Sequence, residues 1–187
     1  LLIAPNVKAN NVSELIALLK SKPGQFNYGS SGNGTIVHLT GELFKSVTGT
    51  YVVHIPYRGT ALVIPDMVSG QIHMLFDNIA SAMPHLKDGK LRAIAVTSTQ
   101  RSPLLPALPT VADSVPGFES VVWFGVFGPK AMPADITQRL NSEINTVLKS
   151  PEFLERLRVL GYDAAGGTPA DFARVVAADA AKWAKLI

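Results

Sequence analysis

The sequence predicts an α/β fold, because strand-like and helix-like segments alternate along the chain. Residues 71–77 alternate between apolar and polar side chains, as in a strand with one buried face. Apolar residues between Ile36 and Val47 recur three or four positions apart, as on one face of a helix. With 187 residues, 47% of them hydrophobic, the chain is long enough for one large or two small lobes with a real core.

The first two thirds of the chain contain most of the predicted strands. Cap residues, glycine stops and β-branched runs set the expected boundaries. In chain order we expect a strand over 1–4, a helix capped by Ser13, a strand over 26–28, a helix from Ile36 to Gly49, a strand over 51–55, a helix broken or delayed by Pro65 over 60–69, a strand over 71–77, a short helix stopped by Gly89 and a strand over 91–96.

The last third is expected to be mostly helical. Residues 98–117 form a proline-rich connection in which Thr110 and Asp113 make a capping pair. A buried strand over 120–127 and helices over 133–149, 151–160 and 169–187 follow, the last of them capped by Thr168. Composition changes near residue 122, so we divide the chain into domains at 5–122 and 123–187.

A loop rich in serine and glycine, Ser30-Ser31-Gly32-Asn33-Gly34-Thr35, lies between a predicted strand and a predicted helix. Unpaired N–H groups and hydroxyls at the positive end of a helix dipole suit a carboxylate or a phosphate. The alternative is that Thr35 only caps the helix while the glycines make a tight turn. Known nucleotide-binding and nucleophile motifs do not fit, because Val37 and Asn33 stand where glycines belong.

Two further candidate sites lie at predicted strand ends, where ligands of open α/β sheets bind. Tyr57 and Arg58 form a turn after the strand over 51–55, and Asp77 ends the strand over 71–77. Arg58 is equally compatible with a solvated turn, and Asp77 with a helix cap. Ser31, His38 and Asp77 are the residue types of a catalytic triad, although most such triples in a chain are accidental.

Several classes of function are disfavoured by composition. The formal charge is +3, but no three basic residues are consecutive, which argues against a nucleic-acid interface. The chain has no cysteine, and its four histidines have no metal-site spacing, so we expect neither a metal nor another cofactor. No apolar stretch approaches the length needed to span a bilayer, so we expect no direct membrane insertion.

Taken together, the motifs resemble the Bug family, the extracytoplasmic solute receptors of tripartite tricarboxylate transporters. The residues that carry the resemblance are Lys22-Pro23-Gly24, Tyr28-Gly29-Ser30-Ser31-Gly32-Asn33-Gly34-Thr35, Glu42-Leu43-Phe44, Pro56-Tyr57-Arg58-Gly59, Met74-Leu75-Phe76-Asp77, Gly89-Lys90-Leu91-Arg92-Ala93 and Trp123-Phe124-Gly125.

This resemblance implies a type II periplasmic binding protein, with two lobes around a cleft that closes on a ligand. The implied ligand is a small organic carboxylate, a di- or tricarboxylate or an acidic amino acid, and the implied partners are membrane subunits of the transporter. Family members carry a signal peptide and a longer upstream segment. By that comparison 5–122 is the substrate-binding lobe, and 123–187 completes a second lobe that is largely absent from this chain.

The resemblance also assigns roles at the site. Ser30, Ser31, Gly32, Gly34 and Thr35 are expected to form the carboxylate loop, and His38 is expected to support it. Tyr57 and Arg58 are expected to border the cleft, and Asp77 to face the distal end of the ligand. Two alternatives remain: a serine-type acyl hydrolase that uses Ser31 and His38, and a sensory ligand-binding module that docks on a kinase.

Overall fold

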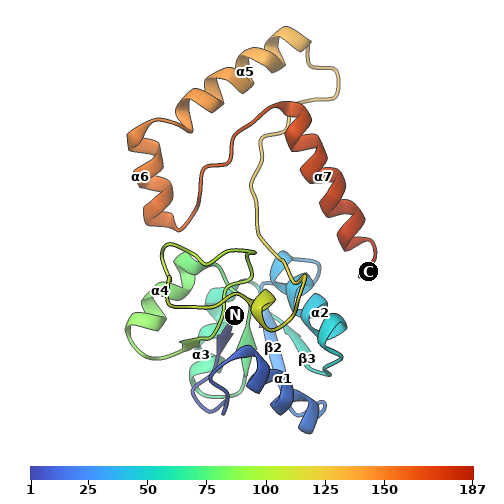
Figure 1. The fold of residues 1–187 in the computed structure, drawn as a ribbon, viewed down its shortest axis with the longest axis vertical. Helices are drawn as coiled ribbons and strands as arrows, with labels where there is room; N and C mark the ends of the chain where they lie inside the picture. The colour runs from blue at the N-terminus through green and yellow to red at the C-terminus, as the bar shows by residue number, and fades with distance from the viewer. The chain divides into compact units, whose positions relative to one another are not determined.

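The computed structural model describes residues 1–187, which divide into two compact units, Leu1–Val122 and Trp123–Lys185. Figure 1 shows strands only in the first unit and only helices in the second. The assignment of the two units to different lobes of a larger receptor remains a prediction.

A five-stranded sheet forms the centre of the first unit, in the order β3-β2-β4-β1-β5. The strands are short: β1 (Leu2–Ile3), β2 (Asn27–Ser30), β3 (Val53–Pro56), β4 (Met74–Leu75) and β5 (Arg92–Ala93). Strand β2 pairs in parallel with both β3 and β4, whereas β1 runs antiparallel to β4 and β5. The carboxyl ends of β2, β3 and β4 therefore lie at the same edge of the sheet.

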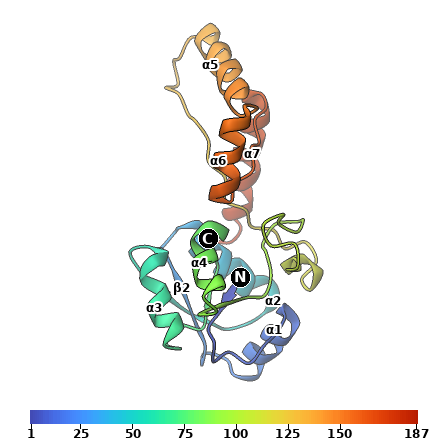
Figure 2. The same ribbon diagram turned by 90° about the vertical axis from the view of Figure 1, so that its left-hand side faces the viewer.

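Helices pack on both faces of this sheet, because neighbouring residues of one strand point to opposite faces. Ile3 and Met74 belong to one apolar cluster, and Leu2 and Leu75 to another. The first cluster includes residues of α1 (Val12–Ser21), and the second includes residues of α3 (Val63–Val68) and α4 (Ile79–Lys87). Figure 2 shows α1 and α3 on opposite sides of the sheet.

Helix α2 (Ile36–Thr48) contributes to both clusters, with Phe44 in the first and Val37 in the second. Thr35 caps the start of α2, and Gly49 ends it in the left-handed conformation, with a φ of 63°. Both boundaries match the sequence-based expectation, because each depends only on residues within one turn.

The start of α1 differs from the prediction. Asn11, not Ser13, is the N-cap, and its side chain accepts the Glu14 N–H at 2.8 Å. Glu14 in turn accepts the Asn10 N–H at 2.8 Å. With Asn11 as the cap, Glu14 occupies the third helical position, where its carboxylate can satisfy a second free amide.

Pro65 delays the helix after β3, as expected. A turn of 3-10 helix, η1 (Thr60–Leu62), precedes α3, and Pro65 lies in the first turn of α3. Proline is tolerated there because amides of the first turn have no intrahelical acceptor. The capping pair of Thr110 and Asp113 is confirmed at η2 (Val111–Asp113).

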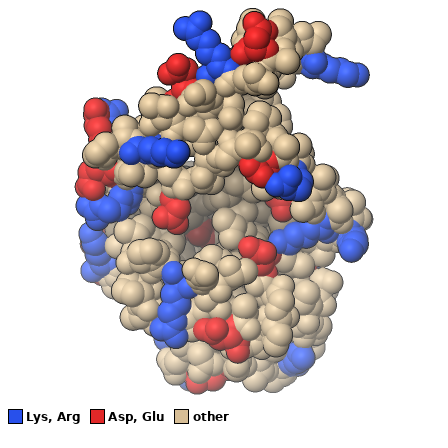
Figure 3. Space-filling view, turned by 45° about the horizontal axis from the view of Figure 1, so that its top comes forward, with Lys and Arg blue, Asp and Glu red and all other residues tan.

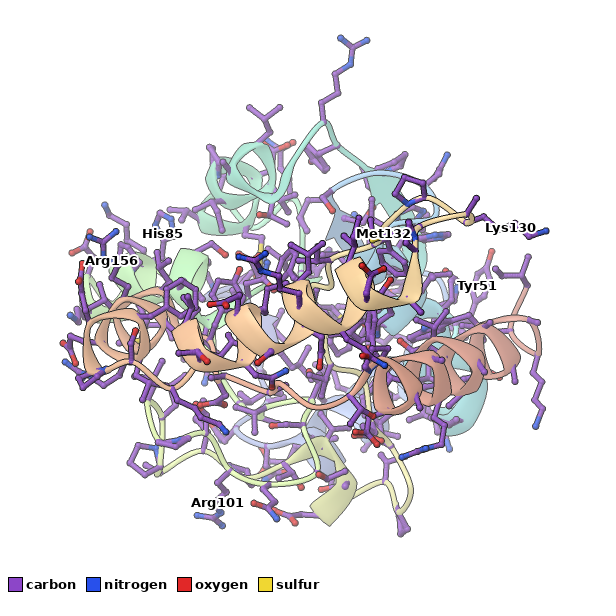
Figure 4. All side chains as sticks on the ribbon, turned by 90° about the horizontal axis from the view of Figure 1, so that it is seen from above. Tyr51, His85, Arg101, Lys130, Met132 and Arg156 are labelled. Atoms are coloured by element: carbon purple, nitrogen blue, oxygen red, sulfur yellow. The ribbon has the colours of Figure 1, made fainter.

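The second unit contains α5 (Ala134–Val147), α6 (Pro151–Leu160) and α7 (Pro169–Trp183). Thr168 and Asp171 form the expected capping box of α7. No residue of these three helices is buried. Figure 4 shows Lys130 and Arg156 extending away from the ribbon.

The predicted buried strand over 120–127 is wrong. No strand forms there, and Phe124, Val126 and Phe127 are exposed. A strand exists only when a neighbouring strand satisfies its backbone groups, and this segment pairs with no strand of the sheet. The segment is apolar, as the sequence shows, but apolar composition alone does not supply the neighbouring strand that a β-strand needs.

Candidate functional site

Three loops meet at the carboxyl edge of the parallel strands. The loop after β2 begins at Ser31, the loop after β3 at Tyr57 and the loop after β4 at Phe76. The first two are in contact: the Tyr57 N–H donates to the Ser30 carbonyl at 3.0 Å. A Cβ atom added to Gly32 would lie 3.6 Å from the Tyr57 carbonyl oxygen. The sheet topology therefore brings the predicted loop residues and the Tyr57–Arg58 turn together.

Much of the polar surface of the serine and glycine loop is used to build the loop itself. Ser30 Oγ accepts the Gly32 N–H at 3.1 Å, and His38 Nδ1 accepts the Gly34 N–H at 3.1 Å. The Thr35 hydroxyl donates to the Gly32 carbonyl at 2.7 Å and accepts the His38 N–H at 3.4 Å. Gly32 and Gly34 have φ values of 131° and 75°, which other residues rarely adopt.

The groups left available to a ligand differ from those that the loop sequence first suggests. The amides of Ser31, Asn33, Ile36 and Val37 donate no hydrogen bond within the chain, and neither does the Ser31 hydroxyl. These donors surround the N-terminus of α2, where the helix dipole favours an anion. Ser30 and Thr35 therefore shape the loop, and the free donors come mainly from the residues between them and from the first turn of α2.

The position of His38 is the one that its spacing predicts. Its Nε2 lies 3.9 Å from Glu42 Oε1, one turn along α2, while its Nδ1 holds Gly34. His38 therefore supports the loop from the helix.

A second histidine, His54 on β3, was not singled out by the sequence. Its Nε2 lies 2.6 Å from Ser30 Oγ, and its ring stacks on the ring of His38 with centroids 4.1 Å apart. The signal that could have found it is the register of β2 and β3, which pairs Tyr28 with His54. A parallel register cannot be read from the spacing of one strand alone.

A charged network lies behind the two histidines. Tyr28 donates to Glu42 at 2.5 Å, and Lys45 Nζ lies 2.8 Å from both oxygens of the same carboxylate. Burial favours a protonated Glu42, but the bonds from Lys45 and Tyr28 outweigh it and hold the Glu42 pKa below its usual value. The pKa of His54 is lowered by burial first, and then by the charge of His38. Glu42 therefore stays ionised and His54 favours its neutral form.

Tyr57 and Arg58 differ in their availability. The Tyr57 hydroxyl donates to Asp66 on α3 at 2.6 Å, and burial together with this bond raises the Tyr57 pKa to about 12. The side chain of Arg58 is exposed and forms no ion pair. Of the two, only Arg58 presents a free polar group.

Asp77 lies directly after β4, at the same edge of the sheet. Its Oδ1 accepts the Asn78 N–H at 2.8 Å, whereas its Oδ2 is buried and has no hydrogen-bond partner. Asp77 does not cap α4, because Asn78 is the N-cap residue and makes no side-chain cap bond. A buried acceptor without a donor is uncommon and favours a role in binding a donor group.

Ser31 and His38 are not arranged as the nucleophile and base of a serine-type hydrolase. Ser31 and His38 are not hydrogen-bonded to each other, because His38 Nδ1 is occupied by Gly34. The serine that does contact a histidine is Ser30, and it is completely buried. No group of three or more His, Asp or Glu side chains is placed to hold a metal ion.

Two properties of the whole chain complete the description. Figure 3 shows Lys and Arg side chains interspersed with Asp and Glu over the face that it draws. None of the helices combines the length and the apolar character needed to cross a membrane.

An open α/β sheet whose parallel strands end in loops with free amides, a free guanidinium and a carboxylate with one unpaired oxygen has the features of a small-ligand-binding unit. The comparison with known families agrees with this class. The model of the tripartite tricarboxylate transporter family receptor matches residues 1–187, and the chain belongs to this family.

Two curated relatives show the extent of the similarity. A UPF0065 protein from the tcbD-tcbE intergenic region of Pseudomonas sp. strain P51 is 34% identical over 100% of this chain and 56% of its own length. Protein BugT of Bordetella pertussis is 32% identical over 98% of this chain and 56% of its own length. The chain thus spans little more than half the length of these relatives, and the suspected membership of the Bug group is confirmed.

Solved structures confirm the fold class. The R. palustris protein Rpa4515, described with adipate, has a TM-score of 0.88 and 36% identity over 100% of this chain and 63% of its own. MatC from Rhodopseudomonas palustris, described with bound malate, has a TM-score of 0.84 and 25% identity over 99% of this chain and 64% of its own. The α/β fold of this chain is therefore that of solved solute-binding proteins, of which it covers about three fifths.

Proposed function

We propose that this chain is the ligand-binding part of a periplasmic solute receptor, which captures a small dicarboxylate and delivers it to the membrane subunits of a tripartite transporter. Membership of the receptor family supports the role. The ligand class is supported by two similar proteins, described with adipate and with bound malate. Similar structures described as a periplasmic transporter and as the periplasmic binding protein BugD support the location.

One observation carries the choice of a carboxylate. Four amides and the Ser31 hydroxyl are free of intramolecular partners around the start of α2. A carboxylate has two oxygens that together accept about four hydrogen bonds, so it can use several of these donors at once. In this proposal Arg58 borders the cleft and attracts the anion, without forming the bidentate clamp of a dedicated carboxylate pocket.

The other end of the ligand is assigned to Asp77. Its buried Oδ2 accepts no hydrogen bond within the chain, so a ligand hydroxyl, an amine or a bridging water can donate to it. An ionised carboxylate placed directly against Asp77 would be repelled, and a water is then needed between the two. Asp77 therefore contributes to the choice among dicarboxylates.

Closure of two lobes supplies the rest of the affinity in this proposal. Residues 5–122 form one wall of the cleft, and residues 123–187 belong with the second lobe. A ligand that contacts both walls stabilises the closed state and shifts the population toward it.

The first test is thermal unfolding of the full-length receptor with a panel that includes adipate, malate and acidic amino acids. A ligand at about 100 times its Kd should stabilise the folded state by about 2.7 kcal/mol, which raises Tm by several degrees. We expect a selective shift with one or a few dicarboxylates. No shift with any acid in the panel would contradict the ligand class.

A second test asks whether the loop supplies the contacts. The Ser31→Ala variant should bind its dicarboxylate about 10- to 100-fold more weakly, since a hydrogen bond to a charged group contributes roughly 1.5–3 kcal/mol. Ser46→Ala is the matched control, because Ser46 is exposed near the far end of α2, the helix that follows the loop. Calorimetric titration of both variants measures the difference, and equal affinities would remove Ser31 from the site.

A further inference from the structure

Three aromatic rings form a stack behind the serine and glycine loop. The ring of His54 lies between those of Tyr28 and His38, with centroids 4.9 Å and 4.1 Å away and interplanar angles of 28° and 26°. The stack joins β2, β3 and α2, the elements that surround the loop. Carboxylate binding as proposed above requires no direct contact with His54.

Each histidine of the stack holds one glycine of the loop. His38 Nδ1 accepts the Gly34 N–H directly, at 3.1 Å. His54 acts through Ser30, whose Oγ lies 2.6 Å from His54 Nε2 and accepts the Gly32 N–H at 3.1 Å. Because both glycines have positive φ values, these bonds select a conformation that the free loop would visit only part of the time.

The bond to Gly34 specifies a protonation state. An imidazole nitrogen can accept a hydrogen bond only when it carries no proton, so His38 must be neutral with its proton on Nε2. That nitrogen faces Glu42, 3.9 Å away. When His38 is charged, Nδ1 becomes a donor that points at the Gly34 N–H, and the bond is lost.

Lys45 already places one positive charge beside the stack, and the surrounding groups do not favour a further positive charge on either histidine ring. Tyr28 from β2 and His38, Glu42 and Lys45 from α2 face His54. The carboxylate of Glu42 is already bonded by Lys45 and Tyr28, so it compensates only part of any further charge. Two stacked imidazolium rings would repel each other at this separation.

We propose that His38 and His54 are positioning residues that hold the carboxylate loop in its binding conformation while both rings are neutral, and that protonation of the stack in acid weakens ligand capture. The proposal rests on the function proposed above. It predicts a receptor that binds firmly at neutral pH and more weakly in acid, where a proton on Nδ1 of His38 would break the bond to Gly34.

Substitutions at His54 separate its hydrogen bond from its titration. In the full-length receptor, His54→Phe keeps a ring in the stack but loses the bond to Ser30, and we expect about tenfold weaker binding of adipate or malate at neutral pH. His54→Gln can still bond to Ser30, so its affinity should lie between those of His54→Phe and the unchanged protein. The double variant His38→Gln/His54→Gln should lose the extra weakening in acid, because glutamine does not titrate.

The matched control is His73→Gln. His73 is also partly buried with a lowered pKa, but it bonds to Asn27 at the start of β2, at the opposite edge of the sheet from the loop. Titration of the ligand itself affects every variant alike, so the ratio of affinities isolates the histidines. The proposal is overturned if His54→Phe binds as the unchanged protein does, if His73→Gln weakens binding equally, or if the double variant keeps the full acid dependence.

A second measurement needs no ligand and separates this proposal from the proposed function. Nitrogen-15 NMR of the histidine rings should show His38 Nδ1 unprotonated at neutral pH, and His54→Phe should shift the amide signals of Gly32 and Gly34, whereas His73→Gln should not. If the unchanged protein binds no acid but these signals behave as described, the ligand class is wrong and the positioning role stands. If His38 carries its proton on Nδ1, the positioning role is wrong whatever the protein binds.

Discussion

Gly41 shows at the scale of one residue how α2 approaches the sheet. A Cβ atom added to Gly41 would lie 2.2 Å from Cε2 of Tyr28, a ring that is buried and whose hydroxyl is tied to Glu42. Only a residue without a side chain lets the helix lie this close to the ring. Tyr28 is a member of the stack behind the loop, so this contact also bears on the site.

We predict that Gly41→Ala destabilises the protein. In an exposed helix the same change is worth roughly 1 kcal/mol of added stability, but here the methyl group must displace a buried ring, which costs about 1–3 kcal/mol. Urea unfolding of Gly41→Ala beside the exposed Ser46→Ala on the same helix measures the difference. A variant as stable as the unchanged protein would show that the ring can move aside, and the close approach would then have no structural importance.

The caps show, at the scale of secondary-structure elements, what local sequence decides. Thr110 and Thr168 were predicted as caps, and Thr35 was the alternative considered for the loop; all three are caps, because each satisfies an amide three residues away. The cap of α1 was misplaced because Asn11 and Ser13 both qualify on local grounds. Glu14 decides between them, since only Asn11 places it at the third helical position.

Helix α7 begins with a full capping box, but none of the helices α5, α6 and α7 has a buried residue. Isolated helices of about 15 residues or fewer are marginal in water, and tertiary packing supplies most of their stability. We predict that a polypeptide of residues 123–187 alone loses most of its helix content, measured by circular dichroism against residues 1–122. Cooperative thermal unfolding of the 123–187 polypeptide would contradict this expectation and make it an independent domain.

For the whole molecule, two histidines link stability to pH. Burial lowers the pKa of His73, and burial and then the charge of His38 lower that of His54, both from an ordinary value of 6.5. A folded state that holds histidines neutral binds fewer protons than the unfolded chain. The stability that the two neutral histidines contribute to the folded state is therefore complete when the pH is above 6.5, the pKa of a histidine in the unfolded chain. It is lost as the pH falls through their lower pKa values in the folded state.

We predict that the free energy of unfolding falls between about pH 7 and pH 5 and that His73→Gln makes this fall shallower. His85→Gln, on the last turn of α4, is the control, and Figure 4 shows its position. Urea unfolding at several pH values measures the slope. An identical slope in His73→Gln and in the unchanged protein would contradict the assignment of His73 to this linkage.

The family, the α/β class and most helix boundaries follow from the sequence alone, because they depend on periodicity, caps and motifs within a few residues. The limit of this reasoning is visible at residues 120–127, whose apolar pattern predicts a strand that has no partner in the sheet. It is also visible in the loop, where the sequence predicts a group of donors but not which of them are free.

Only the tertiary structure decides that the loops after β2, β3 and β4 meet at one edge, since strand order and direction are set by pairing between distant segments. It also decides that Ser30 lies against His54, 24 residues along the chain, and that Tyr28 donates to Glu42, 14 residues along. The sequence by itself determined which residues could bind an anion. The tertiary structure determined which of them hold the loop and which remain free, because a hydrogen bond used inside the fold is no longer available to a ligand.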